Sequence, residues 1–186
     1  MFAIDDALAD VVTSSTQPAL GAIRLAWWRE ALQRLDNSPP PPEPRLQAAA
    51  VELLPRGISG AELAGLEEGW AAMLEEAPDL LFAGERGTRL FRIGARLLDV
   101  EFRDEILGAA GRLFAGVDIG RRGLADIVAG RPGTKGPRIP RPARPLTALA
   151  ALAARDLRRG GPPFEAQATP GRAAALLSHR LFGRVA

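Results

Sequence analysis

Three aspartates near the start of the chain are the residues whose type and spacing could support chemistry. Asp5, Asp6 and Asp10 lie in the run IDDALAD, and Asp6 and Asp10 are four residues apart. In a helix this spacing places both carboxylates on one face. Two such carboxylates can each give Mg²⁺ one oxygen and leave other positions for diphosphate oxygens and water. Acidic residues are also favoured in a first helical turn by the helix dipole, so the pair alone does not establish a metal site.

A cation-bridged diphosphate site in a helical bundle needs a second acidic pair on a facing helix. Asp99 and Asp104 are five residues apart and would not share a face, while Asp118 and Asp126 are isolated. The sequence contains no second D-x-x-x-D motif. It therefore supplies Asp6 and Asp10 as candidate metal ligands, but only half of a diphosphate clamp.

The most strongly patterned stretch is 22–36, AIRLAWWREALQRLD. At helical spacing its apolar residues, including Trp27 and Trp28, cover one broad arc, which predicts an amphipathic helix with a wide buried face. Arg24 lies inside this arc. Because an unpaired buried charge is costly, its guanidinium must pair with a carboxylate, stack on an indole, extend to solvent or face an anionic ligand. The sequence leaves these alternatives open.

The remainder of the chain also has helical periodicity. Ser59-x-x-Glu62 is a capping box that opens a helix with Trp70 on its apolar stripe. The glycines of 106–117 predict a helix that approaches its neighbours closely. Further helices are expected at 2–13, 45–54, 86–100, 146–157 and 172–185, and no segment has a β-strand pattern. We predict an all-α, single-domain bundle of seven or eight helices over residues 1–186.

Composition excludes several classes of site. The chain has no cysteine, so disulfides and thiolate metal sites are ruled out. His179 is the only histidine, which argues against imidazole zinc sites and a Ser-His-Asp triad. No apolar run reaches the ~20 residues of a membrane span, and the acidic start MFAIDDALAD differs from a secretory signal. We expect a cytoplasmic protein.

Charge is distributed unevenly. Residues 1–120 hold 11 arginines and 19 acidic residues, whereas residues 121–186 hold 13 basic and 3 acidic residues. This basic third predicts an acidic partner: phosphate groups, a membrane surface touched peripherally, or the acidic part of the same chain. The lack of tyrosine and the scarcity of other aromatics argue against nucleic acid.

The run 130–145, GRPGTKGPRIPRPARP, has five prolines, five basic residues and no acid. We predict a loop there, either a solvated linker or a phosphate-contacting loop over the mouth of a bundle. The helix expected at 172–185 is basic and amphipathic. It could lie on a membrane surface, although packing on the core is favoured.

The segment 2–36, above all P-x-L-G-x-I-R-L-x-W-W-R-E-A-L, resembles members of the squalene/phytoene synthase family. The resemblance continues through EEGWAAML, RGTRLFRIGARLL, AAGRLFAGVDIGRR and RPLTALAALAARDL, so it covers most of the chain, with the WWRE-centred motif as its distinctive part. It implies the all-α isoprenoid synthase fold. The family's enzymes condense two prenyl diphosphates head-to-head and hold Mg²⁺ with two aspartate-rich motifs on facing helices.

This chain departs from the catalytic pattern of the family it resembles. The first motif would fall at Asp6 and Asp10, or in another register only Asp10 survives, with Ala9 and Thr13 at the other acidic positions. The second motif should lie near 110–126, where no matching pair exists. The chain is also shorter than the enzymes and lacks an N-terminal helix of theirs, so whether Met1 is the true start stays open.

The resemblance is therefore to the divergent branch that includes complex I assembly factors, in which the bundle is kept and the catalytic aspartates are lost. We expect a catalytically degenerate protein that binds a prenyl lipid, a partner protein or a membrane surface and needs no cofactor. Its predicted ligand-binding residues are Trp27, Trp28 and Trp70 around an apolar cavity, with Arg24 at the rim. The alternative is an active Mg²⁺-dependent prenyl transferase. A third interpretation is a plain helical interaction domain with a filled core.

Overall fold

The computed structural model describes residues 1–125 and 138–185. Within these ranges the secondary structure is entirely helical, apart from an isolated bridge between Arg138 and Arg184. The helices are α1 (Phe2–Ser14), α2 (Pro18–Arg34), α3 (Pro44–Glu52), α4 (Gly60–Ala64), α5 (Glu67–Ala71), α6 (Leu80–Leu97), α7 (Asp104–Arg121), α8 (Arg144–Arg158) and α9 (Pro170–Phe182), with 3₁₀ turns η1 (Leu54–Arg56), η2 (Ala72–Leu74) and η3 (Arg141–Ala143). The all-α prediction is confirmed. Counting the short α4 and α5 as one interrupted helix gives eight, as predicted.

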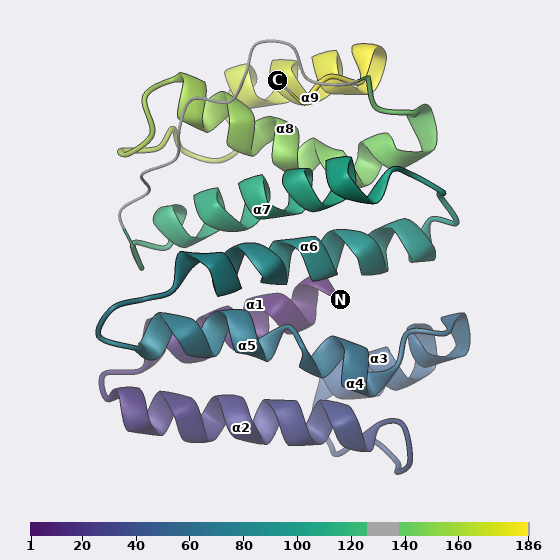
Figure 1. Cartoon of the computed structure of the whole chain (residues 1–186), viewed down its shortest axis with the longest axis vertical. Coiled ribbons are helices and arrows are strands. Elements are labelled where there is room, and N and C mark those ends of the chain that lie inside the picture. Colours follow the sequence, from purple (N-terminus) through teal and green to yellow (C-terminus); the bar gives the residue numbers. More distant parts are fainter. Residues whose placement is uncertain (126–137, 186) are drawn as a thin grey trace.

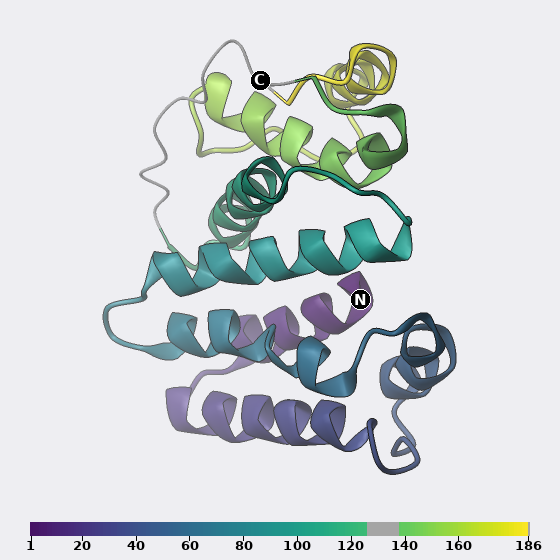
Figure 2. The same cartoon turned by 45° about the vertical axis from the view of Figure 1, so that its right-hand side comes forward.

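The helices are stacked along the long axis of the molecule (Figure 1). Helix α2 lies at one end, α6 and α7 lie in the middle, and α8 and α9 lie at the other end, while α1 packs against α2 and α5 (Figures 1 and 2). The core runs through these layers, with Leu8, Leu25, Leu63 and Phe91 fully buried. Every helix in the described ranges is too short or too polar to cross a membrane.

Helices α6 and α7 approach each other closely through a pair of glycines. A Cβ added to Gly87 would lie 2.0 Å from the carbonyl oxygen of Gly111, and a Cβ on Gly111 would lie 2.2 Å from the carbonyl oxygen of Gly87. No side chain larger than hydrogen fits at this crossing. The expectation that glycines in 106–117 permit close approach is confirmed, and the crossing brings the side chains of α6 next to α7.

The predicted buried face of α2 is confirmed for most of its residues but is narrower than expected. Leu25, Trp28 and Leu32 are buried, but Ile23 is 66% exposed and Trp27 is 48% exposed. The reason is the position of α2 at the end of the bundle. It contacts α1, α4, α5 and η2 on one side only, so the edge of its apolar arc that carries Ile23 and Trp27 stays exposed.

Several helix boundaries also differ from the predictions. The helix expected from residue 86 begins at Leu80, because the Asp79 side chain accepts a hydrogen bond from the backbone N–H of Leu81. In the predicted loop 130–145, residues 130–137 lie outside the described part, and η3 and α8 begin within 138–145. Pro142 and Pro145 occupy the first turns of η3 and α8, where a missing N–H is tolerated, so prolines here start helices.

Candidate functional site

A cluster of charged side chains around one tryptophan lies where four helices meet. We call it the central charge cluster. It consists of Asp5 and Asp6 from α1, Trp70 from α5, Arg86 from α6, and Asp118 and Arg122 from α7. The cluster joins the first helix of the chain to helices from its middle.

Asp5 forms the inner end of the cluster. It is 2% exposed, and its Oδ1 accepts a 2.8 Å hydrogen bond from the indole Nε1–H of Trp70. Its Oδ2 accepts a hydrogen bond from Nη1 of Arg86, whose guanidinium lies 4.0 Å from the centroid of the Trp70 ring. Burial raises the pKa of Asp5, and the Arg86 charge and both hydrogen bonds oppose that rise. The edge of the Trp70 indole therefore donates a hydrogen bond to the Asp5 carboxylate, and the face of the same ring contacts the Arg86 guanidinium.

Two arginines continue the cluster toward the surface. Arg86 donates from Nη2 to Oδ2 of Asp118 at 3.0 Å, so one fully buried guanidinium bridges α1 and α7. Arg122 donates from Nε to Oδ1 of Asp118 at 3.0 Å and from Nη2 to Oδ1 of Asp6 at 2.7 Å. The side chain of Asp6 is 63% exposed. Acids and bases thus alternate from the buried Asp5 to the exposed Asp6.

The cluster places three carboxylates against two guanidinium groups. Each carboxylate of α1 and α7 in this cluster already accepts a hydrogen bond from an arginine, so the negative charges are largely neutralised by the chain itself. Among residues 1–125 and 138–185, no group of three or more His, Cys, Asp or Glu side chains converges in a way that could hold a metal ion. What the arrangement does is cross-link α1, α6 and α7 through buried, paired charges.

The two predicted metal ligands both lie on the exposed face of α1, and their contacts differ. Asp6 belongs to the exposed end of the cluster, where it binds Arg122. Asp10, one turn later, is exposed, and its backbone oxygen accepts a hydrogen bond from the Ser14 hydroxyl. The i,i+4 spacing of Asp6 and Asp10 therefore marks the exposed face of α1. The neighbouring Asp5 lies on the other face and is buried in the core.

The predicted ligand-binding residues lie in different places. Arg24 is exposed on α2, with Nη1 3.3 Å from the Ser14 hydroxyl, so of the alternatives considered it extends to solvent. Trp27 faces outward and packs edge-on against the buried Trp28, with ring centroids 5.4 Å apart. Trp70 is fully buried against Arg86. Trp27 therefore does not share the interior position of Trp70, and only Asp6 and Trp70 of the predicted residues belong to the central charge cluster.

Sequence reasoning missed Arg86, an arginine that is only 1% exposed. The signal lay in its spacing, because Ala83 and Leu90, three residues before and four residues after it, are both buried. Asp5 carries the same signal, since Leu8 and Ala9 follow it at three and four residues and are fully buried. A charged residue on a buried stripe needs a partner, and these two partner each other.

Comparisons of the chain with known protein families, with curated proteins and with solved structures found no match. Function is therefore inferred from the chain's own residues.

Proposed function

We propose that this chain is a catalytically degenerate, squalene/phytoene synthase-like bundle that binds a prenyl lipid or a partner protein. The observation that supports this proposal is the pairing of the carboxylates of α1 and α7 with Arg86 and Arg122. In the enzymes of the family that the sequence resembles, carboxylates on facing helices hold Mg²⁺. Here guanidinium groups occupy the space between acidic side chains of two helices.

A divalent cation would have to compete with these arginines. To reach Asp5 it would displace Arg86, whose guanidinium is fully buried and would keep Asp118 as its remaining carboxylate partner. Breaking one side of a buried ion pair is destabilising, because the buried charge loses compensation. The inner carboxylate is therefore a poor ligand for Mg²⁺, and the exposed Asp6 and Asp10 offer only one helix of a two-helix clamp.

Calorimetric titration with farnesyl diphosphate, with and without Mg²⁺, tests this proposal. The proteins are the wild type, the Asp6→Ala/Asp10→Ala variant and the matched control Glu75→Ala/Glu76→Ala, which removes two exposed carboxylates that do not belong to the cluster. We expect no binding that depends on Mg²⁺. Micromolar binding that needs Mg²⁺ and is lost only in Asp6→Ala/Asp10→Ala would overturn the proposal in favour of the active prenyl transferase.

The same titration separates the two classes of partner. Binding of farnesyl diphosphate that is indifferent to Mg²⁺ and to Asp6→Ala/Asp10→Ala supports a prenyl lipid as the ligand. Farnesol, which lacks the diphosphate, then shows whether the hydrocarbon chain alone is recognised. Absence of binding under all conditions favours a protein partner for the bundle.

A further inference from the structure

Helix α9 has an apolar face that points away from the protein. The helix packs on α8, with His179 as its buried residue. On the opposite side, Leu177 is 58% exposed and Leu181 is 57% exposed, and Phe182 at the end of the helix is 61% exposed. A surface helix of a globular protein normally presents charged and polar residues on this side. Helix α9 thus exposes leucines to solvent at positions where an amphipathic surface helix would normally carry polar residues.

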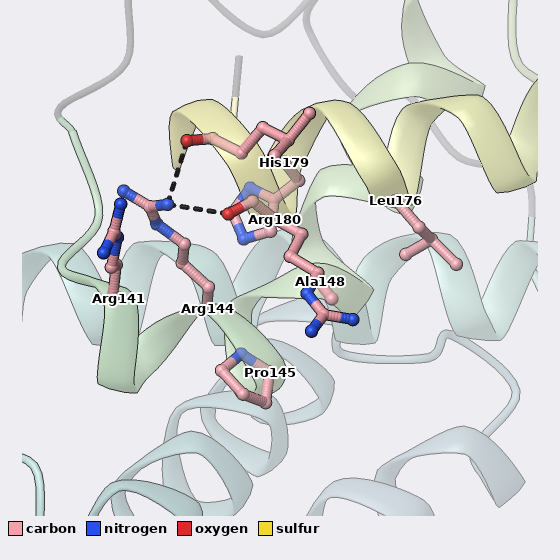
Figure 3. Close-up of a pocket in the computed structure, with 8 residues that line it drawn as sticks. Arg141, Arg144, Pro145, Ala148, Leu176, His179 and Arg180 are labelled. Carbon is pink, nitrogen blue, oxygen red and sulfur yellow. Dashed lines mark hydrogen bonds between the residues drawn. The ribbon is translucent and has the colours of Figure 1, made fainter.

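Three polar contacts anchor this orientation. Near the start of α9, Arg172 donates two hydrogen bonds to the buried carboxylate of Asp156. Near its end, the His179 ring lies between the Thr147 hydroxyl and the backbone oxygen of Arg184. Arg144 of α8 donates to the carbonyl oxygens of Arg180 and Leu181, the last turn of α9 (Figure 3). The helix cannot turn its leucines inward without breaking these contacts.

The surroundings of the apolar face are cationic. Within residues 138–185 the acidic residues are Asp156 and Glu165, and both are held by arginines. The arginines of this range that form no ion pair among the described residues are Arg138, Arg141, Arg144, Arg158, Arg180 and Arg184. Arg141, Arg144 and Arg180 lie together with Leu181 at the C-terminal end of α9.

A pocket beside α9 is likewise lined by both cationic and apolar side chains. It has a volume of about 740 Å³ and lies between η3, α8 and α9 (Figure 3). Arg141, Arg144 and Arg180 supply positive charge, and Leu176 and Leu181 supply apolar wall. Arg144 is 7% exposed, yet its hydrogen bonds go only to carbonyl oxygens, so its charge has no anionic partner among the described residues. A phosphate attached to a hydrocarbon chain matches this lining.

We propose that the outward face of α9 docks on an anionic lipid bilayer. Leu177, Leu181 and Phe182 enter the interfacial layer, while neighbouring arginines such as Arg141 and Arg180 contact lipid phosphates. One observation favours a bilayer over an acidic protein: among the described residues, α9 lies in the last layer at one end of the bundle, within reach of a flat surface (Figures 1 and 2). The proposal is independent of the central charge cluster, to which α9 contributes nothing.

An environment-sensitive label tests whether α9 enters lipid. Because the chain has no cysteine, Phe182→Cys provides a unique site for a nitrobenzoxadiazole dye, and Leu81→Cys, at a residue that is 79% exposed on α6, is the matched control. We expect a blue shift of the dye at position 182 with vesicles of phosphatidylcholine and phosphatidylglycerol, but not with phosphatidylcholine alone. No shift at position 182, or an equal shift at position 81, would overturn the proposal.

Vesicle sedimentation then tests the side chains. Leu177→Glu/Leu181→Glu is compared with Val51→Glu/Leu81→Glu, which alters net charge equally at two other exposed apolar residues. We expect at least about a tenfold loss of binding to anionic vesicles in the first variant only, since two apolar anchors become anions. Circular dichroism establishes that both variants fold. Unchanged binding of the α9 variant, or equal competition by soluble polyglutamate, would reduce the contact to charge alone and overturn lipid docking.

Discussion

The indole Nε1–H of Trp70 donates a 2.8 Å hydrogen bond to Oδ1 of Asp5, joining two fully or nearly fully buried residues that are 65 positions apart in the sequence. The same indole ring lies under the guanidinium of Arg86. One side chain from the short helix α5 therefore orients both members of a buried ion pair. This relationship predicts that the central charge cluster depends on Trp70 for more than its volume.

Replacing Trp70 with phenylalanine tests this dependence. The variant keeps an aromatic face for Arg86 but leaves Asp5 without one of its donors, and an unsatisfied buried acceptor costs about 1–3 kcal/mol. We expect the free energy of unfolding to fall by that amount or more, because the smaller ring also leaves space. Urea denaturation followed by circular dichroism measures it. Trp27→Phe, at a half-exposed ring, is the control, and an equal loss in both variants would contradict the prediction.

Removing the base of the buried pair should be more damaging. Arg86→Met leaves the carboxylates of Asp5 and Asp118 without their shared cation, and we expect a loss of roughly 3–5 kcal/mol of stability. In the double variant Asp5→Asn/Arg86→Met the loss should be smaller than the sum of the two single losses, because no buried charge remains at the inner end. A double-mutant cycle in urea measures this coupling.

The exposed end of the cluster supplies the control for that cycle. Asp6 is 63% exposed, so Asp6→Asn should change the free energy of unfolding by only about 0–1 kcal/mol. If Arg86→Met cost no more than Asp6→Asn, the buried pair would not stabilise the contact between α1 and α7.

The helices of this fold were predictable because their signals are local. The Ser59 half of the capping box forms as expected, with the Ser59 hydroxyl accepting from the N–H of Glu62, while the Glu62 carboxylate pairs with Arg96. The glycines of 106–117 mark a close helix crossing, also as expected. The width of the buried face of α2 was not predictable, because the sequence does not reveal that this helix ends the stack. Ile23 and Trp27 fit a buried stripe and still lie outside.

The central charge cluster could not be predicted from local sequence patterns, because its members come from helices far apart in the chain. Asp5 and Arg86 are 81 residues apart, and their pairing depends on how α1 and α6 cross. The spacing of Asp6 and Asp10 is a valid rule for sharing a helix face, but it does not say which face is buried. Asp5, one residue earlier, lies on the buried face, and only its apolar neighbours at helical spacing signal this.

Glu165, in the connection before α9, makes acid stability testable. Hydrogen bonds from Arg155 and Thr169 lower its pKa from 4.5 to about 2. Because the folded pKa is below the unfolded one, its stabilisation is complete above pH 4.5 and is lost as pH falls toward 2. Glu165→Gln should therefore lower Tm most at neutral pH, and its difference from wild type should shrink below pH 4.5. Thermal unfolding at several pH values measures this, with the exposed Glu76→Gln as control. A difference independent of pH would contradict the assignment.

Glu67 should show the opposite dependence on pH. Glu67 is 4% exposed, and it forms an ion pair with Arg29, whose Nη1 lies 3.6 Å from Oε2 of Glu67. Burial raises the pKa of Glu67 above 4.5, and the Arg29 charge only partly opposes the rise. Because the folded pKa exceeds the unfolded one, the folded state binds the proton more tightly, and stability is lost as pH rises through the folded pKa.

Glu67→Gln keeps the shape of the side chain and removes its charge. We therefore expect this variant to be at least as stable as wild type at pH 7, with a higher Tm, and to lose that advantage at pH 4 and below. Glu68→Gln is the matched control, because Glu68 is exposed and pairs with Arg89 on the surface. Thermal unfolding of the three proteins at pH 4 and pH 7 decides the matter. A Glu67→Gln variant that is less stable than wild type at pH 7 would mean that attraction to Arg29 outweighs the burial of the charge.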